Sequence, residues 1–458
     1  MKNLVLYLLL ALFVSTSACN FLEETSPNDI NADGVIKNAA NAEAALLGLY
    51  SAMQQKSYYG GNYTLIADGI SDDGLTGGYN YFSLDEIGNK QVTPANILVQ
   101  EMYISLYRTV ANCNVLLTAL PSVTDLKADR QKEIEAQAKS IRALAHFDAL
   151  RFFGEHWNAN SEYGVPIVKT VQTINDVAPR ATVAATYTFI IDELKAALTG
   201  INPTDDRVQY VNGNTINALL ARVYLYKIDK PNAVASATKV IDNKRFALLP
   251  AASYGDIFNT RRTSESVFEL SFDKQNRSDY NGLTYSRDAA LRTEISYFAA
   301  AGLNAFFATR PNDVRAAMVD FDSTHNDVTI IPNGRTQKYR GEEAKDNPAY
   351  ILRLAEMYLI RAEANGRTAG LADLNLIRTQ RGLKALKTVD VANDVSFLDA
   401  VLNERRAELN FEGHRYFDLA RTNRIKTVIG IDNYRGILPI PTREIEAGKG
   451  LVKQNPGY

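Results

Sequence analysis

The stretch ERRAELNFEGHRYFDLAR, residues Glu404–Arg421, decides the fold of this chain. Its first half places Glu404 and Glu408 four residues apart, which puts both on one face of a helix. Gly413 then stops the helix, and the charged residues resume at a spacing of three. The pattern therefore predicts two short helices. We expect arginine–carboxylate pairs to lock them together, because the planar guanidinium binds a carboxylate through two hydrogen bonds.

Two interpretations of Glu404 and Glu408 remain open at this point. They form either a general acid/base pair or part of a structural ion-pair network. The four arginines at 405, 406, 415 and 421 favour the network. Nearby positive charge lowers the pKa of a carboxyl group, whereas a general acid needs a raised pKa.

The same stretch resembles the C-terminal signature of the SusD/RagB family, which are outer-membrane nutrient-binding lipoproteins of Bacteroidetes. Residues 138–154, AKSIRALAHFDALRFFG, and the run Leu438-Pro439-Ile440-Pro441 resemble the family too. The resemblance implies a protein that captures an oligosaccharide or similar nutrient at the cell surface. It also implies delivery of that nutrient to a SusC-like TonB-dependent transporter, with no bond made or broken.

Hydrophobic periodicity predicts a mostly α fold. Successive helices should form tetratricopeptide-like hairpins, with a loop-rich, partly extended insertion. We expect one domain over residues 39–458, with loop-rich regions at 57–93 and 245–347, and a strand at Val267–Phe272. The predicted helices are Ala39–Gln55, Pro94–Leu120, Arg130–Phe153, Thr182–Leu198, Gly213–Asp229, Ala349–Ala364 and Leu371–Arg381.

The N-terminus predicts export and lipid anchoring. Residues 1–18 carry Lys2, an apolar run and then small residues, which is typical of a signal peptide and too short to span a membrane. Ser17-Ala18-Cys19 resembles a bacterial lipobox, in which Cys19 becomes acylated; ordinary secretion is the alternative. Residues 19–38 would be the tether. The resemblance then implies an outer-membrane location, exposed at the surface.

Composition excludes several classes of function. The chain has 458 residues and a net charge of −2, with no basic block, so we expect no nucleic-acid partner. It has no phosphate loop, metal-ligand spacing or nucleophile motif, so we expect no catalytic residue, metal or cofactor. Asp29–Gly34 looks like half a calcium loop, but Ala40 stands where the glutamate belongs. Cys113 and His146 are expected to be buried packing residues.

Aromatic residues in the two loop-rich regions are the candidate ligand contacts. Tyrosine offers a ring face to a sugar's C–H groups and a hydroxyl to its polar edge, and carboxylates can accept the sugar's hydroxyl groups. The segment Tyr58–Asn89 is expected to be one long functional loop. The predicted ligand-binding residues are Tyr58, Tyr59, Asp72, Asp73, Tyr79, Tyr81, Tyr280, Tyr285 and Arg287.

Two alternatives belong to other classes of protein. A surface glycoside hydrolase would need a carboxylate pair with one raised pKa inside the aromatic cleft. An adhesin or structural surface lipoprotein would use the same loops to contact another protein, and glycans would then not raise its melting temperature.

Overall fold

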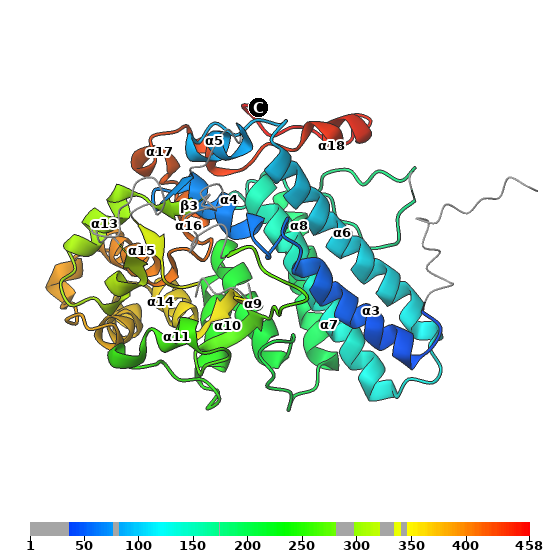
Figure 1. Ribbon diagram of the computed structural model, residues 1–458, viewed down its shortest axis with the longest axis horizontal. Coiled ribbons are helices and arrows are strands. Elements are labelled where there is room, and N and C mark those ends of the chain that lie inside the picture. Colours follow the sequence, from blue (N-terminus) through cyan, green and yellow to red (C-terminus); the bar gives the residue numbers. More distant parts are fainter. Residues whose placement is uncertain (1–35, 77–81, 174, 281–296, 321–333, 340–345) are drawn as a thin grey trace, which may run out of the picture.

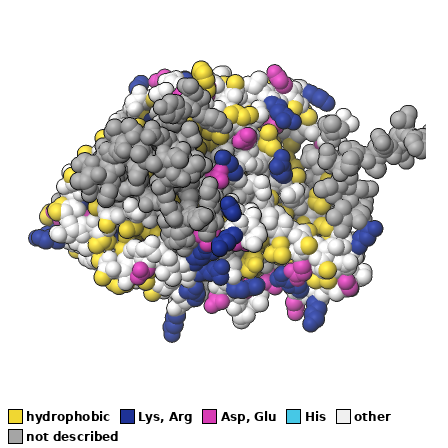
Figure 2. Space-filling view, viewed as in Figure 1, with side chains coloured by type: hydrophobic (Ala, Val, Ile, Leu, Met, Phe, Trp, Pro, Cys, Tyr) yellow, Lys and Arg dark blue, Asp and Glu magenta, His cyan; other side chains and the backbone are white. Residues whose placement is uncertain are grey.

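The computed structural model describes residues 36–76, 82–173, 175–280, 297–320, 334–339 and 346–458. Long helices lie side by side at one end of the molecule, and short helices and strands gather at the other (Figure 1). Figure 2 shows acidic and basic side chains interspersed on one face, as a net charge of −2 allows.

Four helices of the N-terminal half form the first bundle: α3 (Ala39–Met53), α6 (Ile97–Ala119), α7 (Ala128–Phe153) and α8 (Val183–Gly200). The side chains of Asn38 and Asn96 cap α3 and α6 by accepting a backbone N–H of the first turn. Along α7, the buried Ala138 and Ala145 let neighbouring helices approach closely. These helices confirm the predicted ones to within a few residues.

The second set continues the same packing. Helix α9 (Gly213–Tyr226) pairs with α10 (Lys230–Ile241), α10 packs on α14 (Leu354–Gln380), and α14 packs on α15 (Asp394–Leu409). This succession of hairpins confirms the tetratricopeptide-like arrangement. Shorter helices complete the chain: α4 (Asn62–Ile70), α5 (Phe82–Gly88), α11 (Asp256–Asn259), α13 (Ala301–Ala308), α16 (Arg415–Arg421), α17 (Ile425–Val428) and α18 (Thr442–Ala447).

The described strands form three antiparallel pairs. Strand β1 (Gly74–Thr76) pairs with β3 (Tyr297–Ala299), β2 (Ser266–Leu270) with β6 (Ala349–Arg353), and β4 (Val319–Asp320) with β5 (Arg335–Thr336). The 3₁₀ turns are η1 (Leu120–Ser122), η2 (Ala251–Ser253), η3 (Val314–Met318), η5 (Thr388–Val391) and η6 (Asn433–Gly436).

Two predictions of secondary structure were wrong. Residues 349–353 form a strand and not the start of a helix, because they pair with β2, and α14 begins only at Leu354. The segment Tyr58–Asn89 is not one long loop, since it contains α4, β1 and α5. Every residue of α4 is buried, so tertiary packing overrides its loop-like composition.

The predicted break within Glu404–Arg421 is confirmed. Helix α15 ends at Leu409 and α16 begins at Arg415. Between them Phe411 and Gly413 take the left-handed φ angles of 60° and 75°. A Cβ atom at Gly413 would lie 2.8 Å from Cε1 of Tyr63, so this junction requires glycine for its backbone and for the space.

Candidate ligand-binding region

The ends of three sequence segments meet at one place. Thr76 of β1 lies opposite Tyr297 of β3, and the backbone N–H of Ala299 donates to the carbonyl of Gly334 at 2.8 Å. In the neighbouring β4–β5 pair, the backbone of Asp320 lies opposite the backbone of Arg335. At least one residue that flanks each of the segments 77–81, 281–296 and 321–333 therefore lies at this meeting point, although the three segments are distant in sequence.

An exposed aromatic residue stands beside this meeting point. Phe82, the first residue of α5, is 85% exposed, and Leu75 of β1 is 40% exposed. The hydroxyl of Thr76 donates to the carbonyl of Leu84 at 2.8 Å, which fixes α5 against β1. Phe82 is not among the predicted ligand contacts, although it ends the aromatic run Tyr79-Asn80-Tyr81-Phe82, whose composition could have indicated it.

Six of the predicted ligand residues lie either outside the described residues or in ion pairs with arginines. Tyr79, Tyr81, Tyr285 and Arg287 lie outside the described residues. Asp72 binds Arg415 through two hydrogen bonds of 2.7 and 3.0 Å.

Asp72 and Asp73 share the side chain of Arg406. Its Nε donates to Oδ1 of Asp73 at 2.5 Å, and its Nη2 lies 3.2 Å from Oδ2 of Asp72. The guanidinium also lies 4.8 Å from the ring centroid of Phe306 on α13. Asp72, Asp73, Arg406 and Arg415, which we call the aspartate–arginine clamp, thus connect the β1 strand to α15 and α16.

The remaining predicted tyrosines are buried in this structure. Tyr58 and Tyr59 stack with ring centroids 4.3 Å apart, and both hydroxyls donate to Oδ2 of Asp148, at 2.5 and 2.6 Å. Burial and the charge of Asp148 raise the pKa of both hydroxyls well above the ordinary value. Tyr280 stacks on Tyr339 at 4.4 Å. These three tyrosines have almost no exposed surface to offer a ligand, and they contribute to the core.

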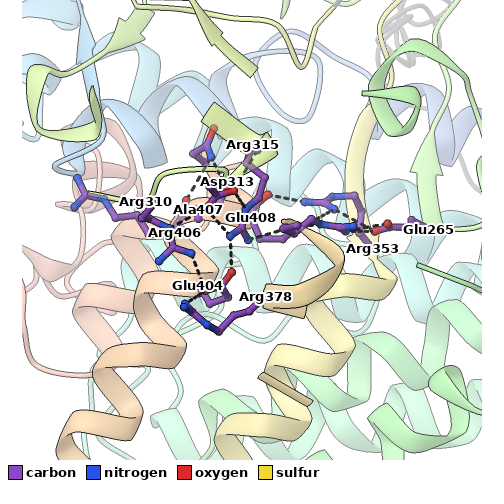
Figure 3. A network of polar contacts seen from close by, with 12 residues as sticks. Glu265, Arg310, Asp313, Arg315, Arg353, Arg378, Glu404, Arg406, Ala407 and Glu408 are labelled. Carbon is purple, nitrogen blue, oxygen red and sulfur yellow. Dashed lines mark hydrogen bonds and ion pairs between the residues drawn. The ribbon is translucent and has the colours of Figure 1, made fainter. Parts of the chain in front are cut away.

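The glutamates of the opening stretch lie in a buried network of arginines (Figure 3). Glu404 binds Arg315, Arg310 and Arg378. Glu408 binds Arg353 at 2.9 Å, Arg381 at 3.0 Å and Arg315 at 3.2 Å. The structural network favoured by the sequence is confirmed.

The electrostatics of the network oppose general acid catalysis by these two glutamates. Burial alone would raise both pKa values, but the arginine charges outweigh it. Arg315 and Arg310 hold the pKa of Glu404 below its ordinary value, and Arg381 and Arg353 hold the pKa of Glu408 well below it. Both groups are therefore stable carboxylates at neutral pH, whereas a general acid must hold a proton.

The predicted packing roles of His146 and Cys113 are confirmed. Nδ1 of His146 lies 2.8 Å from the carbonyl of Arg142, and Nε2 accepts the backbone N–H of Val168 at 3.2 Å. Burial lowers the pKa of His146 to about 4. Burial also raises the pKa of the Cys113 thiol, so neither side chain is reactive at neutral pH.

In the described part of the chain, no three His, Cys, Asp or Glu side chains are grouped so that they could hold a metal ion. Among the residues that the structure describes, no helix combines the length and apolar character needed to cross a bilayer. The calcium-like segment Asp29–Gly34 and the predicted leader with Cys19 lie outside the described residues.

Two family models match separate parts of the chain. The model of the SusD family matches residues 323–458, which include the opening stretch. A second model, described as starch-binding associating with outer membrane, matches residues 20–225. Together these ranges contain α15, α16 and most of the first bundle.

Individual relatives agree over nearly the whole length. SusD-like protein P2 of Formosa agariphila is 23% identical, and the match covers 98% of both chains. A putative sugar binding protein from Bacteroides vulgatus is 26% identical, with a TM-score of 0.79 over 93% of this chain and 99% of that one. A laminarin binding SusD-like protein is 24% identical, with a TM-score of 0.76 over 92% of this chain and 100% of that one.

Proposed function

The chain belongs to the SusD/RagB family, and from this premise we propose that it binds an oligosaccharide at the surface of the outer membrane. In this proposal it passes the ligand to a SusC-like TonB-dependent transporter and catalyses no reaction. Acylation of Cys19 after removal of residues 1–18 would anchor it, with residues 19–38 as tether. The family description that names the outer membrane supports the location.

One observation carries the binding proposal. The segments that contain Tyr79, Tyr81, Tyr285 and Arg287 all begin or end where β1 meets β3, next to the exposed ring of Phe82. In this proposal the aromatic rings and the guanidinium of these segments contact the sugar, which needs both stacking and hydrogen bonds. The laminarin binding neighbour, which shares the fold, makes β-glucan fragments a sensible first ligand.

The proposal is tested by a thermal-shift screen of residues 20–458 against plant and host glycans, including laminarin oligosaccharides. A ligand that binds only the folded state raises the melting temperature. We expect at least one glycan to give a shift that is lost in the Phe82→Ala variant and in the Tyr79→Ala/Tyr81→Ala double variant. Leu47→Ala is the control, because Leu47 is 52% exposed on α3 and should keep the shift.

Two results would count against oligosaccharide binding and transport. Release of reducing sugar from the glycan that binds would indicate a hydrolase. No shift with any glycan would favour an adhesin or a structural lipoprotein. Delivery is tested separately, by co-purification with a SusC-like transporter, and the same Phe82→Ala variant should still co-purify.

A further inference from the structure

A cavity of about 340 Å³ is lined by residues of α9, α10, α14, α15 and the end of α16. This volume falls at the lower end of the ~300–1,000 Å³ range of small-molecule sites. None of its lining residues comes from α4, β1, β3 or α13, so it is separate from the candidate region around Phe82. The walls include apolar side chains of Leu225, Ala364, Phe397 and Leu398.

Its rim carries a residue in an unfavourable backbone conformation. Ile228 has a φ angle of 63° and its side chain is 64% exposed. The turn after α9 requires this angle, because Ile228 and Asp229 donate their N–H groups back to Leu225 and Tyr224. Glycine or asparagine would adopt the angle more easily than a β-branched residue. An exposed isoleucine that is strained here suggests that its side chain serves a contact.

A second irregularity lies on the opposite wall. Gly366 interrupts α14 with φ 71° and ψ −176°, so the helix is bent where it borders the cavity. A Cβ atom at Gly366 would meet nothing within 4 Å, so the bend faces open space. Arg367, the next residue, thereby also reaches the lining.

The charged side chains of the lining differ in whether another protein group binds them. Arg421 is held by Glu363 and Asp418. Lys230, Arg367 and Asp394, in contrast, have no hydrogen-bond or ion-pair partner for their side chains within the described part of the chain.

The buried side of the lining has an unpaired hydroxyl group. Tyr226 is 1% exposed, and its hydroxyl has no hydrogen-bond partner among the described residues. An unpaired buried hydroxyl is unfavourable unless a ligand or water completes it. That hydroxyl is shielded from solvent and does not open onto the cavity, which therefore offers two cations and one carboxylate without protein partners beside apolar walls.

We propose that this cavity is a second ligand site, which binds a small hydroxylated carboxylic acid of the uronic acid class. Lys230 and Arg367 would bind the carboxylate, since charge-assisted hydrogen bonds are the strong ones. Asp394 would bind hydroxyl groups, and Phe397 and Ile228 would cover the C–H face of the ring. A fatty acid would leave Asp394 without a hydrogen-bond donor, and an inorganic anion would leave the apolar walls empty.

Isothermal titration calorimetry of the purified mature protein tests the proposal. The probes are D-glucuronate and D-galacturonate, with D-glucose and D-galactose as neutral counterparts and acetate as the carboxylate alone. We expect a uronate to bind at least about tenfold more tightly than its neutral counterpart and than acetate. Equal affinity for the neutral sugar or for acetate, or no heat with either uronate, would overturn it.

Variants assign the binding to this cavity. Lys230→Gln/Arg367→Gln should weaken uronate binding by about tenfold or more. Lys239→Gln is the matched control, because Lys239 is exposed on the same helix α10 but does not line the cavity. Uronate affinity that is unchanged in the double variant would overturn the assignment.

The Ile228→Gly variant separates a loss of uronate binding from a loss of folding. Removing the strained residue should leave the melting temperature equal or higher, while uronate affinity falls severalfold. Unchanged affinity would overturn the role of Ile228 at the rim. Phe82→Ala should leave uronate binding unaltered, so failure of this site and failure of the proposed oligosaccharide site are distinguishable.

Discussion

Asp72 and Asp73 are adjacent residues whose carboxyl groups respond differently to their surroundings. Burial opposes ionisation of Asp72, but hydrogen bonds from Arg415 and the charges of Arg415 and Arg406 hold its pKa below the ordinary value. Burial is complete at Asp73, and with the neighbouring Asp72 charge it raises the pKa of Asp73 to about 6 despite Arg406. One oxygen of Asp73 also has no hydrogen-bond partner among the described residues.

This raised pKa predicts a pH effect of definite sign. The folded value of about 6 exceeds the ordinary 3.8, so the folded protein binds the proton more tightly. The stabilisation is complete below pH 3.8 and is lost as the pH rises through 6. Between pH 7 and pH 5 Asp73 should therefore add about 1 kcal/mol to the free energy of unfolding.

Urea unfolding of the native protein and Asp73→Asn at the two pH values measures this effect. The difference between the two proteins should be larger at pH 5 than at pH 7, in favour of the native protein. A difference that is equal at both pH values would contradict the raised pKa.

Residue type alone does not distinguish a candidate ligand contact from a core residue. Tyr58, Tyr59 and Tyr280 were selected because tyrosine suits sugars, yet the same ring and hydroxyl also suit a core that contains Asp148. Only the packing distinguishes the two uses. Phe82 was missed because a phenylalanine has no polar group, and its 85% exposure follows from its place at the start of α5.

At the scale of the element, a helix or a break could be predicted where the residues that cause it lie within a few positions of one another. The break between α15 and α16 could be predicted because Gly413 and the charge spacing both act within a few residues. Strand β6 and helix α4 could not, since β6 is defined by its partner β2 and α4 by burial. The tetratricopeptide-like hairpins were predictable because each amphipathic helix carries its own period.

Gly413 at the α15–α16 junction and Gly430 after α17 give a matched pair of glycine variants. Gly413→Ala combines a left-handed φ of 75° with a contact of 2.8 Å to Tyr63. Gly430→Ala has a similar φ of 84° and no neighbour within 4 Å. We expect Gly430→Ala to lower the free energy of unfolding by about 1–2 kcal/mol for the backbone alone, and Gly413→Ala by about 1–3 kcal/mol more.

Chemical denaturation of both variants separates the two contributions. The backbone term is common to them, so the difference measures the steric contact with Tyr63. Equal losses would show that Tyr63 moves aside without cost.

For the whole molecule, the ion-pair network connects distant parts of the chain. Glu408 on α15 meets Arg315 of η3 and Arg353 at the end of β6 (Figure 3), and it also meets Arg381 after α14. Arg381 also binds Glu265 before β2. These charges are buried, so each is stable only while its partners are present.

Removing the central charge should therefore destabilise the fold globally. Glu408→Gln leaves three buried arginines short of a carboxylate, and we expect a loss of about 3–5 kcal/mol in the free energy of unfolding. Guanidinium unfolding followed by circular dichroism measures it. Glu446→Gln, at an exposed position on α18, is the control and should change stability by less than about 0.5 kcal/mol. A similar small change for Glu408→Gln would refute the importance of the network.

The aspartate–arginine clamp has a consequence for how the chain folds. Asp72 and Arg415 are 343 positions apart, and Asp73 and Arg406 are 333 apart. These contacts cannot close until nearly the whole polypeptide is available, whereas the first bundle needs only its own residues. We therefore expect the clamp to form after the rate-limiting step of folding. It would then slow unfolding without accelerating folding, and so prolong the life of the native protein.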